Sequence, residues 1–368
     1  MFNGRLGLIQ RVLPSYRAPF FEALALRCAG GLELFAGQPR PEESIASSAS
    51  LSVARLVAGQ NIHIFSTSNP LYFCYQRGLP EWLDAWNPDA LILEANFRYL
   101  ASPAAMHWMH TRGRPLIGWG LGAPHVRGPL AWLRRRFLSQ FDALISYSRR
   151  GAQQYAACIP DLPGDKIFVA PNAVVAAPSQ PALRRAGRFV SRPVILFVGR
   201  LQARKRIPAL LKACASLPEQ LAPRLIIVGD GPEMEPLRAV ARELFPAAEF
   251  VGAKQGQELA EYFTVADLFV LPGTGGLAVQ EAMSYALPVI VAQGDGTQDD
   301  LVRPGNGWQI PADDDEALSA TLLEALSDTA RMHRMGAESY RIVSEEINLQ
   351  SMVSVFVQSL NSVTRRGV

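Results

Sequence analysis

Long apolar runs are absent from this sequence. No uninterrupted run of about 18 apolar residues occurs among its 368 positions, so we expect no membrane-spanning helix. Charge of one sign is not in large excess either, because the formal net charge is +3, and so mild a balance does not indicate a nucleic-acid-binding protein. The N-terminal segment has neither the length nor the cleavage site of a secretory signal. These absences predict a cytoplasmic protein.

Cysteine and histidine are scarce. The four cysteines lie far apart with no C-x-x-C pair, which excludes a disulfide framework and a cysteine-based zinc site. His107 and His110 are spaced by about one helical turn, but no carboxylate or cysteine cluster accompanies them. We therefore expect reduced, buried thiols and no structural metal.

The chain does have enough length for two domains, and 49% of its residues are hydrophobic. Short apolar runs alternate with helix-length segments, which predicts parallel sheets covered by helices on both faces. The expected strands are residues 4–9, 33–36, 62–66, 90–94, 115–119, 143–147 and 167–170, followed by 194–198, 224–228, 250–251, 268–271 and 289–292. Two successive Rossmann-like, doubly wound α/β halves are the simplest fold.

The alternation lapses between residues 172 and 192, where Pro, Ser, Ala and Arg dominate. This composition is typical of a linker. We therefore expect an N-terminal domain at 1–175, a linker at 176–192, a second domain at 193–345, and a C-terminal helix at 346–368 that packs back toward the first domain. Ligands of such sheets bind beyond the carboxyl ends of the strands, so the loops there are the candidate sites.

Two cations follow the expected strand at 194–198. Gly199 and Arg200 come directly after it, and Lys205 precedes the next helix. A glycine allows close approach of the backbone to a ligand, and two cations at a strand end can hold a polyanion. The pattern indicates a diphosphate site, with two solvated surface cations as the alternative.

A glycine-rich segment follows the strand at 268–271. Gly275 and Gly276 precede a helix that begins near Leu277, and free amides at a helix N-terminus can donate to an anion. Glu281 lies about one turn inside that helix, where a carboxylate can accept hydrogen bonds from ribose hydroxyls. A nucleotide contact is expected here, and a plain helix cap with a solvated glutamate is the alternative.

The glycines of the other turns mainly serve the backbone conformation of the turn. Gly229 opens a tight strand-to-helix turn after the strand at 224–228, and residues 305–307 form a similar turn. The turn that begins at Gly294 follows a strand end, so Asp300 beyond it is a candidate secondary contact to substrate.

The motifs of residues 194–312 occur in a characteristic order. They are Gly199-Arg200-Leu201 with Lys205, Gly229-Asp230-Gly231-Pro232, Ala266-Asp267, Leu271-Pro272, Glu281-Ala282-Met283, Leu287-Pro288-Val289-Ile290 and Asn306-Gly307. This order resembles the signature of the glycosyltransferase group 1 domain, found in retaining enzymes of glycosyltransferase family 4 with the GT-B fold. The N-terminal half is similar only in its βα pattern and in a Pro171-Asn172 pair before the linker.

The resemblance implies a metal-independent, retaining hexosyltransferase without a cofactor. Such an enzyme moves a sugar from a nucleoside-diphosphate sugar, such as a UDP-sugar, to a hydroxyl of a glycan or lipid-linked acceptor in bacterial-type surface polysaccharide assembly. It implies that residues 193–345 bind the donor and residues 1–175 the acceptor, across a central cleft. Arg200 and Lys205 would neutralise the departing diphosphate. The nucleotide would be contacted by Gly199, Gly229, Gly275, Gly276, Leu277 and Glu281.

One position departs from the family pattern. Glu281 matches the second glutamate of the E-x7-E motif, but the first falls at Gly273. The usual side-chain contact to the donor sugar's hydroxyls therefore has no counterpart in this sequence.

In the N-terminal half, the family places a histidine near the transferred sugar after the strand at 115–119. His125 follows that strand here, a few residues late, and is assigned this role, with a surface loop histidine as the alternative. Tyr16 and Arg17 lie in the first strand-to-helix loop and are candidate substrate contacts.

Residues 127–138 combine Leu130, Trp132 and Leu133 with four arginines. A basic amphipathic helix with an aromatic residue suits an anionic membrane surface. It predicts peripheral contact at the inner face of the membrane, while a core-packed helix with a solvated basic face is the alternative.

Other functions stay open at this stage. A nucleotide-sugar epimerase or phosphorylase fits the same fold but needs an acid/base pair or a cofactor lysine that no motif marks. A degenerate GT-B protein with a scaffold or partner role is suggested by Gly273. A nicotinamide dehydrogenase is disfavoured, because no G-x-G-x-x-G follows the first strand.

Overall fold

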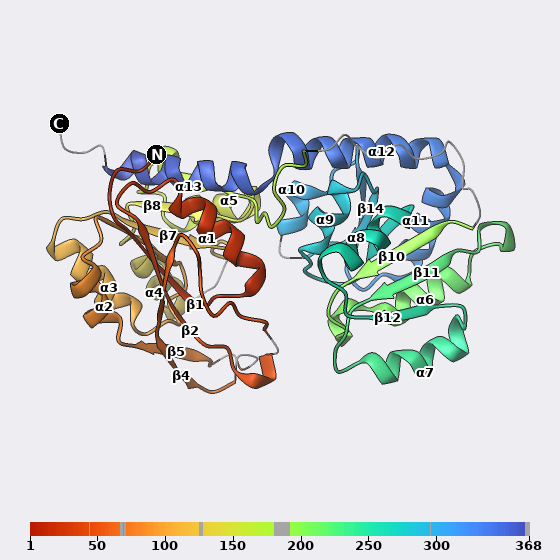
Figure 1. Ribbon diagram of the computed structural model, residues 1–368, viewed down its shortest axis with the longest axis horizontal. Coiled ribbons are helices and arrows are strands. Elements are labelled where there is room, and N and C mark those ends of the chain that lie inside the picture. The colour runs from red at the N-terminus through yellow and green to blue at the C-terminus, as the bar shows by residue number, and fades with distance from the viewer. Residues whose placement is uncertain are drawn as a thin grey trace. The chain divides into compact units, whose positions relative to one another are not determined.

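The computed structural model describes residues 1–43, 45–66, 69, 71–124, 128–179, 192–294 and 296–364. The chain divides into two compact units: unit 1 is Met1–Val174 with Leu349–Val368, and unit 2 is Val175–Asn348 (Figure 1). The predicted linker, 176–192, lies largely outside the described residues. Within those residues, the structure has no helix with the length and hydropathy needed to cross a bilayer.

Unit 1 is built on a parallel seven-stranded sheet with the order β3-β2-β1-β6-β7-β8-β9. Its inner strands are mainly apolar and buried, as expected for strands covered on both faces. The strands are β1 Leu6–Val12, β2 Leu32–Gly37, β3 Arg55–Ala58, β6 Ala90–Glu94, β7 Leu116–Gly120, β8 Ala143–Ser146 and β9 Ile167–Val169.

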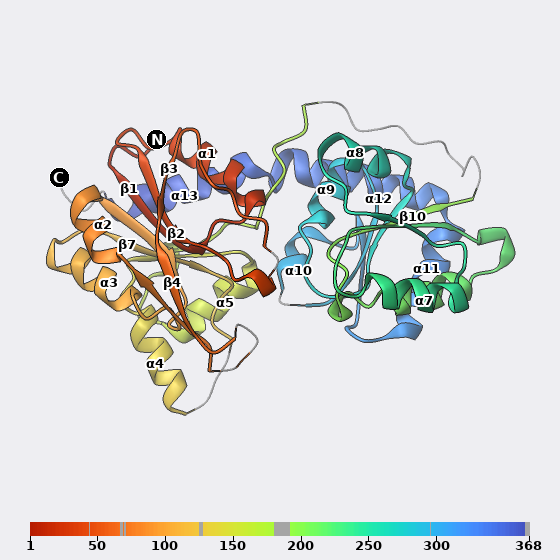
Figure 2. The same cartoon turned by 60° about the horizontal axis from the view of Figure 1, so that its bottom comes forward.

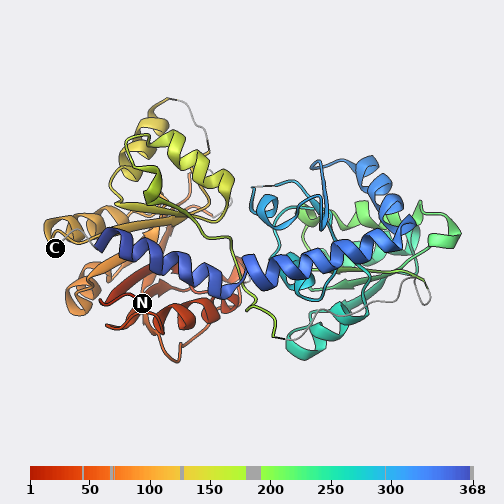
Figure 3. The same ribbon diagram turned by 90° about the horizontal axis from the view of Figure 1, so that it is seen from above.

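Helices cover both faces of this sheet. They are α1 Ala18–Ala25, α2 Leu79–Trp86, α3 Ser102–Thr111, α4 Pro129–Leu138, α5 Arg149–Cys158 and α13 Leu349–Thr364. The C-terminal α13 runs beside α1 along one face, where Phe356 meets Phe20 and Trp119 at ring-centroid distances of 4.8 and 4.9 Å (Figures 1 and 3). Residues of α2, α3 and α4 fill a second core on the other face.

The strand expected at 62–66 does not belong to the parallel sheet. It is β4 Gln60–Ile64, which pairs with β5 Phe73–Arg77 as a separate antiparallel hairpin. Alternate residues of β4 are exposed, so this strand has one solvated face, as antiparallel pairs commonly do. The edge strand β3 was missed because it has only four residues, which are exposed or partly buried.

Unit 2 carries a parallel six-stranded sheet with the order β12-β11-β10-β13-β14-β15. Its strands are β10 Val194–Val198, β11 Arg224–Val228, β12 Glu249–Gly252, β13 Leu268–Leu271, β14 Val289–Ala292 and β15 Gly307–Ile310. The helices are α6 Ile207–Ala215, α7 Met234–Leu244, α8 Gly256–Val265, α9 Ala278–Ser284, α10 Thr297–Leu301, α11 Asp315–Ser327 and α12 Thr329–Arg341, followed by a π-helical turn at Ile342–Glu346.

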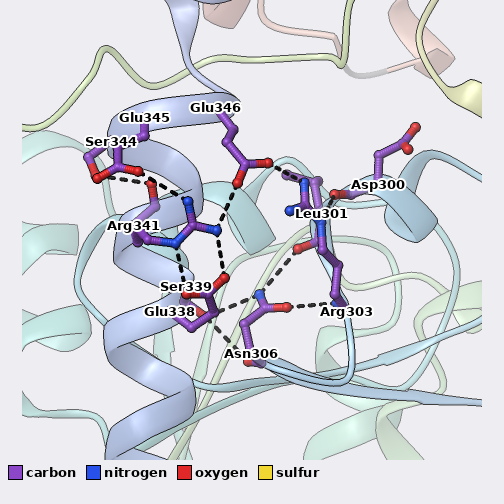
Figure 4. Close-up of polar contacts among 10 residues, drawn as sticks. All are labelled: Asp300, Leu301, Arg303, Asn306, Glu338, Ser339, Arg341, Ser344, Glu345 and Glu346. Atoms are coloured by element: carbon purple, nitrogen blue, oxygen red, sulfur yellow. Dashed lines mark hydrogen bonds and ion pairs between the residues drawn. The ribbon is translucent and has the colours of Figure 1, made fainter.

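The interpretation of residues 305–307 as a simple turn was incomplete. Gly307 begins β15, and Asn306 is fully buried. The Asn306 amide donates to the Leu301 oxygen at 3.1 Å and to Ser339 Oγ at 3.3 Å, and its Oδ1 accepts from the Arg303 amide at 2.7 Å (Figure 4). Asn306 therefore ties the end of α10 to α12.

The four cysteines are unpaired, and Cys28, Cys74 and Cys214 are buried, while Cys158 is half-buried. Burial raises the pKa of the Cys28 and Cys214 thiols to about 12. These groups are therefore structural, as the sequence predicted.

Candidate active site

The sheet of unit 2 reverses its winding between β10 and β13. The chain proceeds from β10 outward to β11 and β12, then crosses to β13 on the other side of β10. Parallel α/β sheets bind ligands at such a switch point, outside the carboxyl ends of the strands. The loops that leave β10 and β13 there carry Arg200, Lys205 and the glycine-rich segment.

The loop after β11 packs tightly on the loop after β10. A Cβ on Gly229 would lie 1.9 Å from the Gly199 oxygen, and one on Gly231 would lie 2.3 Å from the Leu201 oxygen. Gly229 also has a φ of 143°. The Leu201 amide donates to the Asp230 oxygen at 2.9 Å. Glycine is thus required at 229 and 231 to fix the backbone course of residues 199–201.

Lys205 reaches from the β10 loop into the β13 loop. Its side chain is buried, and Nζ donates to the Thr274 oxygen at 2.9 Å and to the Gly275 oxygen. Burial, with a smaller contribution from the nearby Arg204 charge, lowers the pKa of Lys205 to about 8. Lys205 therefore lies against the glycine-rich segment that follows β13.

Gly273 lies against the backbone of the β10 loop. A Cβ at this position would lie 2.1 Å from the Arg204 oxygen and 2.6 Å from Lys205 Cα, and the Thr274 amide donates to the Arg204 oxygen at 3.2 Å. No side chain fits at 273 without separating the two loops. Where the family motif has a glutamate, this chain has a glycine that allows a close contact between the two loops. That contact brings Lys205 to the carbonyls of residues 274 and 275.

Arg204 belongs to the same cluster and was missed by the sequence interpretation. It is exposed, and its Nη1 approaches the Thr274 oxygen at 3.4 Å while its Nε donates to Gln202 at 3.0 Å. Its position directly before Lys205 was the available signal. Arg200 is half-buried at the start of the same loop. Arg200, Arg204 and Lys205 therefore all lie in the loop that leaves β10.

Helix α9 starts one residue after the expected Leu277, which caps it without a side-chain hydrogen bond. Gly275 precedes it with a φ of 67°, a backbone conformation that favours glycine. Glu281 is half-buried, and burial raises the pKa of its carboxyl. The buried Gln280 holds the helix in place by donating to the Ile347 oxygen at 2.7 Å.

Asp300 lies at the end of α10 and is 9% exposed. Its backbone oxygen accepts a hydrogen bond from Arg303 Nε at 3.1 Å (Figure 4). Arg303 also pairs with Glu346 at 2.7 Å, and Glu346 pairs with Arg341 at 2.8 Å. The surroundings of Asp300 thus contribute to the packing of unit 2, and its contact to substrate stays a prediction.

In unit 1, Arg17 is buried and Tyr16 is 46% exposed, in the loop between β1 and α1. The Arg17 guanidinium lies 4.9 and 5.1 Å from the ring centroids of Trp119 and Tyr147, and its Nη2 donates to Tyr147 Oη at 3.1 Å. Burial, first of all, raises the pKa of Tyr147 to about 12. His125 lies outside the described residues.

A pocket of about 420 Å³ opens beyond β6 and β7 of unit 1. The sequence interpretation did not find it, although Glu94 and Tyr147 end two expected strands. Glu94 Oε1 accepts from the Arg11 amide at 2.8 Å, and burial raises the pKa of its carboxyl. The pocket is lined by Glu94, Ala95, Phe97, Arg98, Trp119, Gly120, Arg134, Phe137 and Tyr147, among others.

No group of three or more histidine, cysteine, aspartate or glutamate side chains that could hold a metal ion occurs in the part of the chain that the structure describes. Metal independence stays a prediction.

Comparison with known proteins shows which family part of this chain resembles. Residues 179–342 match the family model "Glycosyl transferases group 1". The GDP-mannose-dependent alpha-mannosyltransferase of Mycobacterium tuberculosis is 38% identical over 132 residues, which cover 35% of this chain and 33% of the relative. The putative colanic acid biosynthesis glycosyltransferase WcaL of Escherichia coli is 31% identical, covering 37% and 38%. The chain thus spans about a third of the length of these two relatives.

The structural likeness extends over both units. HepE of Anabaena, solved in complex with UDP, superposes with a TM-score of 0.71 at 15% identity, covering 98% of this chain and all of HepE (100%). At that identity the likeness establishes the fold. The chain therefore has the GT-B fold, and its residues 179–342 match the glycosyl transferases group 1 domain.

Proposed function

We propose that this protein is a retaining, metal-independent hexosyltransferase that takes its sugar from a nucleoside-diphosphate donor. The observation that carries the proposal is the position of Lys205: its ammonium lies between two loops at the switch point of unit 2. Donor use is further supported by the match to group 1 glycosyltransferases. Retention is part of the proposal because the motif order resembles that of retaining enzymes.

Lys205 provides the charge that the reaction needs. An ammonium has three donors, and two of them serve the Thr274 and Gly275 oxygens, which leaves one for a phosphate oxygen among the described groups. A buried cation is attracted to an anion more strongly than an exposed one. As the glycosidic bond breaks and an oxocarbenium-like sugar forms, Lys205 and Arg200 would stabilise the departing diphosphate.

The other site residues position the donor in this proposal. Gly199 leaves the end of β10 open to close approach of the diphosphate, Gly229 lets the β11 loop pack against it, and Glu281 accepts hydrogen bonds from the ribose. Gly275, Gly276 and Leu277 offer backbone amides at the start of α9. The contact to the donor sugar, which Gly273 cannot make, falls to another group.

The acceptor in this proposal is a hydroxyl of a glycan or of a lipid-linked sugar, bound by unit 1 at the inner face of the membrane. The relative named for colanic acid biosynthesis supports a role in surface glycan assembly. Tyr16, Arg17 and His125 of unit 1 are the proposed substrate contacts, with His125 near the transferred sugar.

Thermal-shift screening against UDP, GDP, ADP and TDP and their sugars is the direct test. A bound donor raises the melting temperature through mass action. The proposal expects one base to give a shift in the wild type that is lost in Lys205→Ala, and slow hydrolysis of the matching nucleotide sugar. A protein that gives a shift with none of them and hydrolyses none of the sugars would instead fit the scaffold role.

A further inference from the structure

Arg206 directly follows Lys205 and has a left-handed backbone conformation, with a φ of 54° and a ψ of 37°. A residue with a Cβ adopts this conformation at a cost, and arginine lacks the short polar side chain by which asparagine or aspartate tolerates it. Among the described residues, four other non-glycine positions have a positive φ, and one of them is Asp313, at 62°. Such strain persists only where the surrounding structure holds it in place.

Two carboxylates hold the Arg206 side chain. Its Nε lies 3.2 Å from Asp313 Oδ1, and its Nη2 donates to Asp315 Oδ1 at 2.5 Å. The Arg206 side chain is only 20% exposed, and it makes both ion pairs at once. A network of charges contributes more to stability than one exposed ion pair does. These pairs are therefore able to offset the strain at residue 206.

The two aspartates belong to a different part of unit 2. Asp313 lies in the loop after β15, and Asp315 is the first residue of α11, which packs beside α6 (Figures 1 and 2). The start of α11 is itself fixed, because Asp314 Oδ1 accepts from the Ala317 amide at 2.8 Å. Arg206 thus ties the loop after β10 to a rigid helix start.

The left-handed turn at Arg206 determines the direction of the chain on both sides of it. The Arg206 amide donates to the Ala203 oxygen at 3.0 Å, and the Arg206 oxygen accepts from the Ala209 amide at 3.1 Å at the start of α6. Lys205 lies between these two hydrogen bonds, and from there its Nζ reaches the Thr274 oxygen. The position of the ammonium therefore depends on the backbone conformation of the next residue.

The Arg206 guanidinium is not placed to bind a phosphate itself. Its Nε and Nη2 face the two carboxylates, and its Nη1 is buried, with no hydrogen-bond partner among the described residues. A phosphate oxygen that reached Arg206 would have to displace an aspartate. The role that this geometry leaves for Arg206 is exerted through its neighbour Lys205.

We propose that Arg206 is a positioning residue: its paired guanidinium holds residue 206 in the left-handed conformation that directs the Lys205 ammonium to the β13 loop. The effect on the nucleotide rests on the proposed donor site, but the position of Lys205 can be followed without any ligand. Glycine adopts this conformation without the ion pairs, whereas alanine has a Cβ and cannot make them. Arg206→Gly and Arg206→Ala should therefore differ.

Lysine acetylation by a water-soluble active ester, read by mass spectrometry, reports the position of Lys205. In the wild type the buried Lys205 should react more slowly than the exposed Lys212 of α6. Arg206→Ala should speed the labelling of Lys205 by about 5- to 30-fold, since labelling follows the fraction of open loops. Arg206→Gly should restore slow labelling. Arg224→Ala, which removes an ion-paired arginine from β11, is the control and should label like the wild type.

Asp313→Asn with Asp315→Asn tests the ion pairs while Arg206 is kept. This double variant should speed the labelling of Lys205 in the wild-type chain but not in the Arg206→Gly background, where there is no pair to lose. Equally slow labelling in all variants would overturn the proposal. Equally fast labelling in Arg206→Ala and Arg206→Gly would overturn it as well.

Calorimetric titration with the nucleoside diphosphate relates the position of Lys205 to the donor. Arg206→Ala should lose about 5- to 30-fold in affinity at neutral pH, and Arg206→Gly should stay within about threefold of the wild type. The double asparagine variant makes the site more positive, so a purely electrostatic role predicts tighter binding, whereas positioning predicts weaker binding.

An equal loss of affinity in Arg206→Ala and Arg206→Gly would mean that the guanidinium binds the diphosphate directly, which contradicts the proposal. If the wild type binds no nucleoside diphosphate, the proposed donor site fails, and the labelling rates of Lys205 still decide whether Arg206 positions it.

Discussion

The Lys205 ammonium donates to the backbone oxygen of Thr274 across 2.9 Å, from the loop of β10 to the loop of β13. These two strands are neighbours in the sheet although they are far apart in the sequence. A further hydrogen bond joins them, from the Val194 amide to the Asp267 carboxylate 73 residues along the chain. The contact depends on Gly273, because any side chain there would hold the two loops apart. The proposed donor site is therefore an arrangement of loops, not of isolated motif residues.

Removing either predicted phosphate-binding cation should slow transfer. We expect Lys205→Ala and Arg200→Ala each to cost about 2 to 4 kcal/mol in transition-state stabilisation, the scale of one lost charged donor. The measurement is kcat/KM with the donor found by the screen. Lys212→Ala, which removes an exposed cation from α6, serves as the control. Wild-type turnover in Lys205→Ala would refute its assignment.

Donor affinity should fall at alkaline pH. The free protein holds the pKa of Lys205 at about 8, below its ordinary value, so the ammonium loses its proton as the pH rises through 8. A bound diphosphate favours the charged form, and the affinity should then drop by up to about tenfold per pH unit above 8. Calorimetric titration of the nucleoside diphosphate between about pH 7 and 10 measures this, since the phosphates stay ionised there.

Lys205→Arg is the matched variant for this profile. Its guanidinium stays protonated throughout the range, so its affinity should be weaker at neutral pH but flat above pH 8. A parallel decline in both proteins would assign the titration to another group.

A side chain at position 273 should destabilise unit 2. Gly273→Ala places a Cβ 2.1 Å from the Arg204 oxygen, and we expect a loss of about 1 to 3 kcal/mol in the free energy of unfolding. Gly273→Glu, which restores the family residue, should lower activity instead of raising it. Urea unfolding followed by fluorescence gives the free energy.

Gly164→Ala is the control for that substitution, because an added Cβ there meets no atom within 4 Å. It should change stability by less than about 0.5 kcal/mol. A gain of activity in Gly273→Glu with unchanged stability would contradict the loop arrangement described for Lys205.

Loss of the buried Asn306 amide should destabilise the packing of α12 on the sheet. Asn306→Ala leaves the Arg303 amide and the Leu301 oxygen without their partner, at a cost of about 1 to 3 kcal/mol for each unsatisfied buried group. Denaturant unfolding measures this, with Gln257→Ala on the exposed face of α8 as the control. Equal stability of the two variants would argue against the role of Asn306.

The sequence predicted the regular parts of the fold well. Buried parallel strands are continuous apolar runs, so the residues at 90–94, 194–198 and 289–292 were recognised with their bounds. It failed where burial is partial or one-sided: β3 is a partly exposed edge strand, and β4 turned out to be half of an antiparallel hairpin. Asn306 could not be recognised as buried because Ser339, its partner on α12, lies 33 residues further along the chain.

For the site, local motifs identified the residues but not their contacts. Gly199, Lys205 and Gly275 follow strand ends, which sheet topology gathers at one edge. The meaning of Gly273 could not be inferred, because it depends on how closely two loops approach each other. The exposure of Trp132 was equally undecided, since helical periodicity does not say whether an apolar face finds a partner.

The central claim is that Lys205 binds the donor diphosphate. The most direct measurement is calorimetric titration of wild type and Lys205→Ala with the nucleoside diphosphate chosen by the screen, at neutral pH. The account predicts saturable binding in the wild type and a loss of about tenfold or more in Lys205→Ala, since a hydrogen bond to a charged group is worth about 1.5 to 3 kcal/mol. Equal affinity in the two proteins would contradict it.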